Sequence, residues 1–348
     1  MKKIIKYLLI GLVIICIILL IIFILIKIKR TINYSNDNYY KYYQNNVKEE
    51  QINNDENNTY ETVIVHTNKY EDMDIKDETF AKELIEKDSL KEEAKCNNNL
   101  KEIEEKIKDT TNIYGINLCE INEEEASKIL NSLEYVYNNY PIIKDYVTNI
   151  TLVNDGGTSS YIAAFKPSFT FATSNKEDNF PFIIKIQVFL NSSYYLNDKY
   201  LDSVIENAIN TGHFPKDTTK ESLIVHEFGH VLTYVLAIKH YNSINTLVLK
   251  NNDFQKYANT LNEYTKSKFS KKIVDESYNN YINKYSKISE EKFRHNISSY
   301  ANTTSNDGEV LYNETIAEAF HDYYLHKEQA KKESLEIINT LNKYIIEN

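Results

Sequence analysis

A His-Glu-x-x-His segment, running from His226 to His230, is the part of the chain best suited to chemistry. Two histidines four residues apart lie on one face of an α-helix, about one turn from each other, where two imidazoles can bind the same Zn²⁺. Glu227 is rotated about 100° from His226 around such a helix. It is therefore poorly placed as a third ligand and well placed to take a proton from a water molecule beside the metal.

A catalytic zinc site needs a third protein ligand and keeps its fourth position open for water. The metzincin pattern would place a histidine six residues after the second one, but this position is Leu236, so that class is excluded. A later segment, Asn313–His326, offers three acids at helical spacing, Glu314, Glu318 and Asp322. Apolar residues surround these acids, which argues against a plain solvent-exposed face. We therefore expect the third ligand in this segment, with Asn313 as its helix N-cap.

Four stretches together resemble a known family: HEFGH, SYANT (Ser299–Thr303), NETIAEAF (Asn313–Phe320) and the closing NKYIIEN. They are similar to the catalytic domain of anthrax lethal factor and to the related pro-pro endopeptidases, which are zinc peptidases of the gluzincin type. The resemblance covers about residues 140–348 and is most specific in the ExxAEAF stretch. It implies a zincin-like fold and peptide-bond hydrolysis.

The resemblance also implies roles for two residues outside the HEFGH helix. Glu314 takes the place of the third zinc ligand, and Tyr300 takes the place of a tyrosine that assists the transition state. Tyr300 precedes Glu314 across an extra loop, Thr304–Tyr312, so Tyr312 is the alternative. Glu318 is a candidate for orienting His226 or His230 by a hydrogen bond.

The elements that must position these residues can be predicted from hydrophobic patterning. Residues 221–240 form an apolar helix, with Thr218 and Glu221 as a capping box. Gly229 inside this helix costs about 1 kcal/mol relative to Ala, which indicates close packing against the sheet or the metal site. Further helices and strands are predicted upstream: helices at 123–139, with Asn122 as N-cap, and at 198–210, and strands at 150–153, 160–165 and 182–190. The chain after residue 218 is almost entirely helical, so we expect an α+β fold with a small mixed sheet and a helical C-terminal lobe.

The N-terminal hundred residues are of a different kind. Tyr7–Ile26 contains no charge and, as a helix, spans about 30 Å of hydrocarbon, so residues 1–30 are predicted to be a membrane anchor. Residues 31–99 are rich in Asn and Tyr, then charged, and are predicted to be a tether and helical stalk, with a short strand at Thr62–Thr67. The folded domain is assigned to residues 100–348, on the outer side of a cell membrane.

Charge and cysteine content narrow the class further. The six cationic residues of the anchor leave 34 Lys and Arg against 50 Asp and Glu, a formal charge of −16, which excludes nucleic-acid binding as the main function. Cys16 lies in the predicted membrane helix, so only Cys96 and Cys119 are left to pair. A disulfide and two free thiols are both open.

These observations favour a membrane-anchored zinc endopeptidase. Its substrate is a protein or peptide at the cell surface, and the resemblance implies a Pro-rich surface protein among the candidates. An extended substrate is expected to pair with an edge strand, either Phe182–Leu190 or Gly156–Phe165. Two alternatives remain: a surface adhesion or interaction protein with a structural or inactive metal site, and a quality-control protease facing the cytoplasm.

Overall fold

The structure is a computed structural model that describes residues 63–65, 96–97, 99–144, 146–154, 161–170, 183–244, 247–249, 260–261 and 263–347. The predicted membrane helix and nearly all of the predicted tether lie outside these residues. Within the described ranges, no helix is both long enough and apolar enough to span a membrane. The helices and strands below belong to one compact unit, formed by Asn58–Thr303 and Val310–Asn348.

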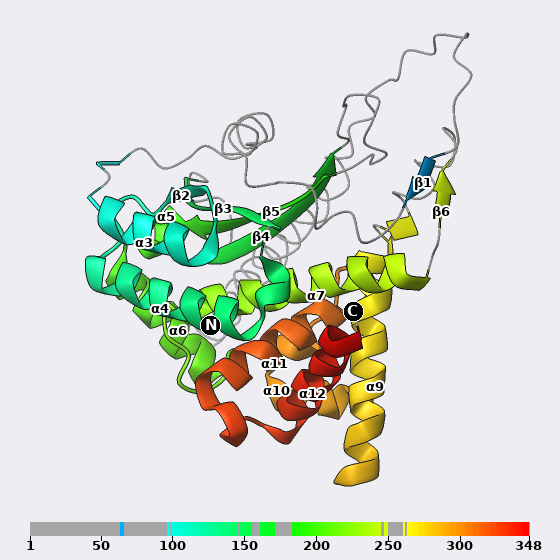
Figure 1. The fold of residues 1–348 in the computed structure, drawn as a ribbon. Coiled ribbons are helices and arrows are strands. Elements are labelled where there is room, and N and C mark those ends of the chain that lie inside the picture. Colours follow the sequence, from blue (N-terminus) through cyan, green and yellow to red (C-terminus); the bar gives the residue numbers. More distant parts are fainter. Residues whose placement is uncertain are drawn as a thin grey trace, which may run out of the picture. The chain divides into compact units, whose positions relative to one another are not determined.

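A four-stranded mixed sheet, with strand order β2-β3-β5-β4, covers one side of this unit (Figure 1). β2 (Gly115–Asn117), β3 (Val147–Val153) and β5 (Ile183–Asn191) are parallel, while β4 (Ala163–Thr170) runs antiparallel to β5 and forms an edge. Branched and aromatic residues explain β3 and β5. The bounds of β5 differ by one residue at each end from the prediction, whereas β3 begins three residues earlier than predicted.

The predicted bounds of β4 were wrong, because the strand begins three residues later than Ser160 and continues to Thr170. Lys166, Pro167 and Ser168 interrupt the apolar pattern there. Their inclusion is explained by the edge position, since a proline is tolerated where one side of a strand has no partner strand.

Helices α3 (Lys101–Thr111) and α5 (Ser192–Tyr195) contact the sheet at β2 and β5, respectively. Helix α4 (Glu123–Asn139) packs against α3 and α7, and α6 (Asp198–Asn210) follows α5. The predicted bounds of α4 and α6 are confirmed. The side chain of Asn122 caps α4, because its amide oxygen accepts a hydrogen bond of 2.9 Å from the Glu124 backbone N–H. Glu125, in the first turn of α4, pairs with Lys220 at 2.6 Å and so fastens α4 to the segment that precedes α7.

Helix α7 (Leu223–Ile244) crosses the middle of the unit, with the sheet on one side and the C-terminal helices on the other (Figure 1). Its described residues are buried almost all the way round, as expected of a helix packed on two sides. The predicted capping box was wrong: the Thr218 hydroxyl donates to the Pro215 carbonyl at 2.8 Å, and the Thr219 N–H donates to the Ser222 hydroxyl at 2.9 Å. A turn therefore precedes the helix, which starts two residues later than Glu221.

The C-terminal lobe is helical, as the sequence predicted. Its elements are the π-helix η3 (Tyr264–Lys268), α9 (Phe269–Lys284), α10 (Glu290–Ile297), the 3-10 turn η4 (Tyr300–Asn302), α11 (Tyr312–His326) and α12 (Lys332–Glu347). Asn313 is not the N-cap of α11, which begins one residue earlier. The Asn313 side chain instead donates to Glu314 Oε1 at 3.1 Å. The whole is an α+β fold, as predicted.

Two pairings involve residues near the N-terminal side of the described chain. The predicted short strand is present as β1 (Val63–Val65), paired antiparallel with β6 (Leu247–Leu249).

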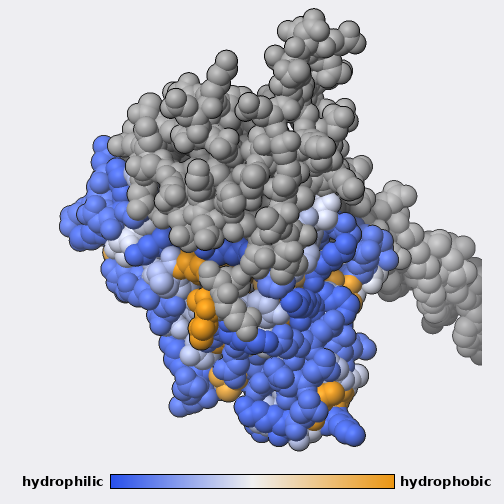
Figure 2. Space-filling model, turned by 45° about the vertical axis from the view of Figure 1, so that its right-hand side comes forward, coloured by the Kyte–Doolittle hydropathy of each residue, from blue (hydrophilic) through white to orange (hydrophobic). Residues whose placement is uncertain are grey.

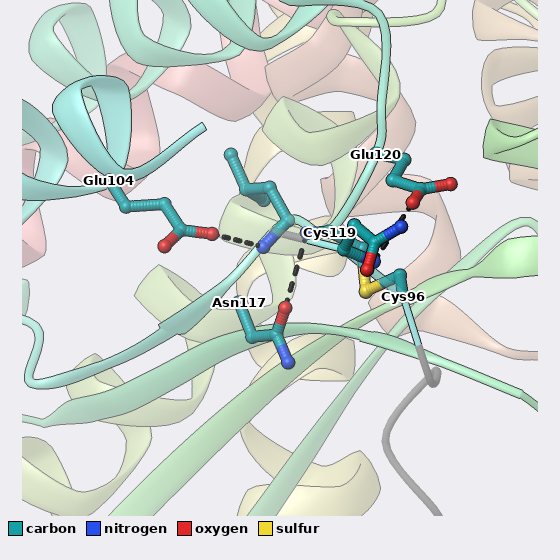
Figure 3. The surroundings of a disulfide bond; sticks show 7 residues. Cys96, Glu104, Asn117, Cys119 and Glu120 are labelled. Carbon is teal, nitrogen blue, oxygen red and sulfur yellow. Dashed lines mark hydrogen bonds between the residues drawn. A yellow bond between two sulfur atoms is a disulfide. The ribbon is translucent and has the colours of Figure 1, made fainter. Parts of the chain in front are cut away.

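Cys96 and Cys119 form the disulfide that the sequence left open (Figure 3). Beside it, the Leu118 N–H donates to the Glu104 carboxylate at 2.7 Å and the Asn97 N–H donates to Glu120 at 2.8 Å. The segment before α3 is thereby fastened to the loop before α4.

The described surface on the face drawn in Figure 2 is mainly hydrophilic, with hydrophobic residues in small spots. The large apolar side chains that are exposed among the described residues lie on separate helices or their ends: Leu196, Tyr200, Tyr285 and Ile346. This agrees with the acidic, solvated domain that the composition indicates.

Candidate metal site

Three side-chain atoms from α7 and α11 converge on one point of the buried interior. His226 Nε2 lies 3.2 Å from His230 Nε2, and each of these nitrogens lies 3.3 Å from Glu314 Oε2. The three side chains form one of the groups of described residues able to hold a metal ion. They are 7%, 4% and 5% exposed, respectively, so the atoms face one another rather than bulk solvent. The structure thus brings together the three metal ligands that the sequence and the resemblance proposed.

Close contact between the two helices makes this convergence possible. A Cβ atom on Gly229 would lie 2.9 Å from Ala317 Cα and 3.2 Å from Phe320 Cβ, closer than carbon atoms pack. Gly229 therefore adjoins α11, and the expected alternative of packing against the sheet does not hold. His230 follows this glycine directly, and Glu314 lies one turn before Ala317, so the contact point sits beside the ligands on both helices.

The electrostatics of the site favour a bound cation. Burial acts to raise the pKa of Glu314, but the neighbouring His230 and His226 outweigh it and hold that pKa well below its usual range. Burial likewise acts to lower the pKa of His226, and here Glu314 and Glu318 outweigh it and raise the pKa well above its usual value. Buried carboxylates that raise the pKa of a neighbouring imidazole carry negative charge. A bound metal ion compensates this negative charge.

Glu318 supports the site from behind the ligands. One of its oxygens lies 2.8 Å from His226 Nδ1, and the other accepts a hydrogen bond of 2.7 Å from the Ser298 hydroxyl. The side chain is fully buried. Glu318 is thus placed to fix the orientation of the His226 ring, one of the two alternatives that the sequence left for it.

Glu227 is buried next to the candidate ligands, on the same helix as His226 and His230. Burial raises the pKa of its carboxyl group, while His226 and His230 act in the opposite direction. A backbone hydrogen bond with Phe165 of β4 also acts to lower this pKa. The Phe165 ring itself stacks on the His230 ring, with centroids 4.9 Å apart and planes inclined by 11°. Strand β4 therefore borders the site directly.

Tyr300, and not Tyr312, lies at the site. The Tyr300 ring stacks on His226 with centroids 5.7 Å apart, and the negative charge of Glu314, followed by burial, raises the pKa of its phenol well above the usual value. Tyr312 instead places its ring near Lys271 and Arg294, with the cations 5.2 and 5.6 Å from the ring centre. Tyr312 is the first residue of α11, and these contacts direct its ring to α9 and α10.

A second group of donors, His226, Glu318 and His321, also lies within 4.8 Å. It shares His226 with the first group, and one ring nitrogen of His321 contacts the Ser222 hydroxyl at 2.8 Å. Burial lowers the pKa of His321 well below its usual value. We assign His321 to fastening α11 to the start of α7, and the first group to metal binding.

Several residues around the site were missed by the sequence reasoning. Phe165, Ser298 and His321 act through contacts between elements that are far apart in the chain, and no local spacing signals them. His213, which packs against Tyr300, is also among them. Comparison with known proteins adds nothing to these assignments, because no family model, curated protein or solved structure matches this chain.

Proposed function

We propose that this chain is a zinc endopeptidase of the lethal-factor-like type. The observation that carries the proposal is the triangle formed by His226 Nε2, His230 Nε2 and Glu314 Oε2, with sides of 3.2, 3.3 and 3.3 Å. Glu227, buried beside this triangle, has no task in a purely structural metal site. The placement of α7 between a mixed sheet and a helical lobe also fits a zincin-like architecture.

The donor atoms suit Zn²⁺. Two imidazole nitrogens and one carboxylate oxygen make up a catalytic zinc set that leaves a fourth position open. Ligand atoms about 2.0–2.1 Å from a tetrahedral Zn²⁺ lie about 3.3–3.4 Å from one another, which matches the triangle. When bound, Zn²⁺ would lower the pKa of a water molecule and polarise the scissile carbonyl.

Glu227 is the general base of this proposal. Its position, one residue after a ligand on the same helix, puts its carboxylate at the edge of the site. Because burial raises its pKa above the usual value, the group is a stronger base, able to take up a proton from the attacking water and later release it to the leaving amine. A freely exposed glutamate would be a weaker base for the same task.

Tyr300 is the electrophilic assistant. The carboxylates around it and its burial raise the pKa of the phenol, so the hydroxyl keeps its proton at any physiological pH. A protonated phenol at this place can donate a hydrogen bond to the oxyanion that forms when the carbonyl is attacked.

Strand β4 is the proposed docking edge for an extended peptide. Two segments were candidates for the docking edge. The Phe182–Leu190 segment corresponds to β5, which lies inside the sheet between β3 and β4. The Gly156–Phe165 segment includes the first three residues of β4, which is an edge strand. A peptide that adds to β4 runs past Phe165, which contacts both His230 and Glu227. This placement supports a protein or peptide substrate, for which the resemblance suggests Pro-rich surface proteins.

The disulfide supports the proposed location. Disulfides form and persist in oxidising compartments and are rare in the cytoplasm. The disulfide joins Cys96, near the end of the predicted tether and stalk, to Cys119 in the folded domain. We therefore place the domain outside the membrane that residues 1–30 are proposed to span.

The substitution Glu227→Gln tests the mechanism. The full chain, purified in detergent with equimolar Zn²⁺, is incubated with a randomised peptide library that is read by mass spectrometry. We expect cleavage by the parent chain, and at least about 100-fold slower cleavage by the variant at unchanged zinc content. Glu206→Gln, at an exposed position of α6, is the matched control. Undiminished cleavage by Glu227→Gln would refute the mechanism, and zinc binding without any hydrolysis would favour the adhesion protein.

A further inference from the structure

His213 lies in the turn after α6, and its ring contacts that of Tyr300. Its ring centroid is 4.7 Å from that of Tyr300, and Tyr300 lies 5.7 Å from His226 on the way to the metal site. The planes of the two pairs are inclined by 35° and 23°. The Tyr300 ring thus contacts both a proposed metal ligand and a histidine that has no part in the proposed mechanism.

The backbone of this turn is built to hold His213 in place. Gly212 has a φ of +70°, which ends α6 in the left-handed conformation that glycine favours. The His213 N–H then donates to the Ala208 carbonyl at 2.7 Å, and the Gly212 carbonyl accepts a hydrogen bond of 2.8 Å from the Ser299 N–H. The turn is therefore fastened directly to the residue before Tyr300.

The other surroundings of Tyr300 hold its backbone and its hydroxyl group. The Ala301 N–H donates to the Ser298 hydroxyl at 2.9 Å, and the Ala301 carbonyl accepts from the Thr315 hydroxyl at 2.7 Å. The first bond closes the η4 turn, and the second holds this turn against α11. The Tyr300 hydroxyl is hydrogen-bonded to the Glu314 carboxylate, and the phenol ring contacts the rings of His226 and His213. These two neighbouring rings limit rotation of the phenol about its side-chain bonds.

We propose that His213 is a positioning residue that holds the phenol of Tyr300 in the orientation needed for transition-state stabilisation. The role rests on the proposed function, since it concerns the residue that would donate to the oxyanion. His213 acts through its ring: the ring confines that of Tyr300, and the hydroxyl of Tyr300 does the chemistry. A hydrogen-bond donor that is misplaced by about 1 Å loses about 100-fold in rate, so confinement of this ring has a measurable effect.

A double-mutant cycle between His213→Ala and Tyr300→Phe tests this role in the zinc-loaded full chain. Tyr300→Phe removes the hydroxyl and should lower kcat about 100-fold or more with little change in KM. His213→Ala alone should lower kcat about 10-fold, and in the Tyr300→Phe background less than about 3-fold, because no hydroxyl is left to misplace. An equal loss in both backgrounds would overturn the proposal, since His213 would then act independently of the hydroxyl.

Conservative replacement separates ring packing from imidazole chemistry. His213→Phe keeps a ring against Tyr300 and should restore kcat to within about 3-fold of the parent chain. Failure of this variant to restore kcat would also contradict the proposal, because the nitrogens and not the ring would then be required. His295→Ala, at an exposed position of α10, is the control for replacing a histidine.

A readout that does not depend on activity comes from fluorine NMR of 3-fluorotyrosine placed at position 300. We expect one narrow resonance in the parent chain, a shifted or broadened one in His213→Ala, and recovery in His213→Phe, each with and without Zn²⁺. An unchanged resonance in His213→Ala would overturn the positioning role. If the Glu227→Gln test fails instead, the proposed function falls, while this spectrum still reports whether His213 orders the ring.

Discussion

The substitution Gly229→Ala sets two opposing effects against each other within the zinc helix. Alanine is the better helix former and, in an unobstructed helix, would stabilise the chain by about 1 kcal/mol. Here the new Cβ would lie 2.9 Å from Ala317 Cα and 3.2 Å from Phe320 Cβ. The first of these atoms is backbone, so no side chain can turn away to relieve the contact.

The size of the effect follows from these distances. Carbon atoms pack at about 3.5–4.0 Å, so α7 and α11 must separate by about 0.6 Å or more at this point. Overpacking of this kind costs about 1–3 kcal/mol, which equals or exceeds the gain in helix propensity. The net change in the free energy of unfolding is therefore a loss of about 0–2 kcal/mol for the metal-free chain.

The substitution should weaken zinc binding more than it lowers the free energy of unfolding. His230 is next to Gly229 and Glu314 is one turn from Ala317, so the separation acts directly between the ligands. Metal–ligand distances tolerate about 0.2 Å, and the expected loss of zinc affinity is about 10- to 100-fold, or about 1.4–2.7 kcal/mol. The helices can partly relax by rotation, which is why we do not expect abolition of binding.

The assay is competition for Zn²⁺ against a chromophoric chelator, together with urea unfolding of the metal-free full chain. Asn207→Ala, at an exposed position of α6, is the control for the propensity gain and should leave zinc affinity unchanged. If Gly229→Ala stabilises the metal-free chain by about 1 kcal/mol and keeps the parent zinc affinity, the close approach of α7 and α11 does not build the site.

Three further predictions concern the residues around the site and the disulfide. Glu318→Gln should lower zinc affinity about 10- to 100-fold in the same competition assay, because the contact with His226 Nδ1 loses its charge; the same loss in the exposed Glu291→Gln would contradict this reason. Zn²⁺ at 100 times its dissociation constant should raise the free energy of unfolding by about 2.7 kcal/mol in the parent chain and by far less in Glu314→Ala, and an equal rise in both would show that zinc binds elsewhere. Replacing Cys96 and Cys119 together by Ser should lower the free energy of unfolding by about 3 kcal/mol, from the entropy of a loop with a sequence separation of 23, and reduction of the parent chain should produce the same loss.

The sequence was most informative where chemistry follows from local spacing. Two histidines four residues apart in an apolar segment predicted both the helix and the convergence of their rings. The bounds of α4 and α6 were also predictable, because an asparagine cap and a clear helical period mark them. The α+β class followed from the same patterns.

Other features depend on contacts that the sequence does not display. Thr218 has the pattern of a capping box, but its hydroxyl bonds to Pro215, and a turn replaces the first turn of the helix. Tyr300 was predicted with Tyr312 as the alternative, and only the fold shows one ring on His226 and the other near Lys271. The choice of β4 over β5 as the edge required the strand order, which depends on pairing between distant segments.

The two motifs of the site are best understood as one interface. Gly229 lies within the HEFGH motif and Ala317 within the ExxAEAF motif, and these two small residues meet where the helices are closest. Each motif therefore contains both its ligands and the small residue that lets the other motif approach. A search for the ligands alone would accept HExxH and a distant glutamate in any fold. A search that also requires small residues next to the second histidine and one turn after the glutamate selects chains in which the two helices can approach closely enough to share a metal ion.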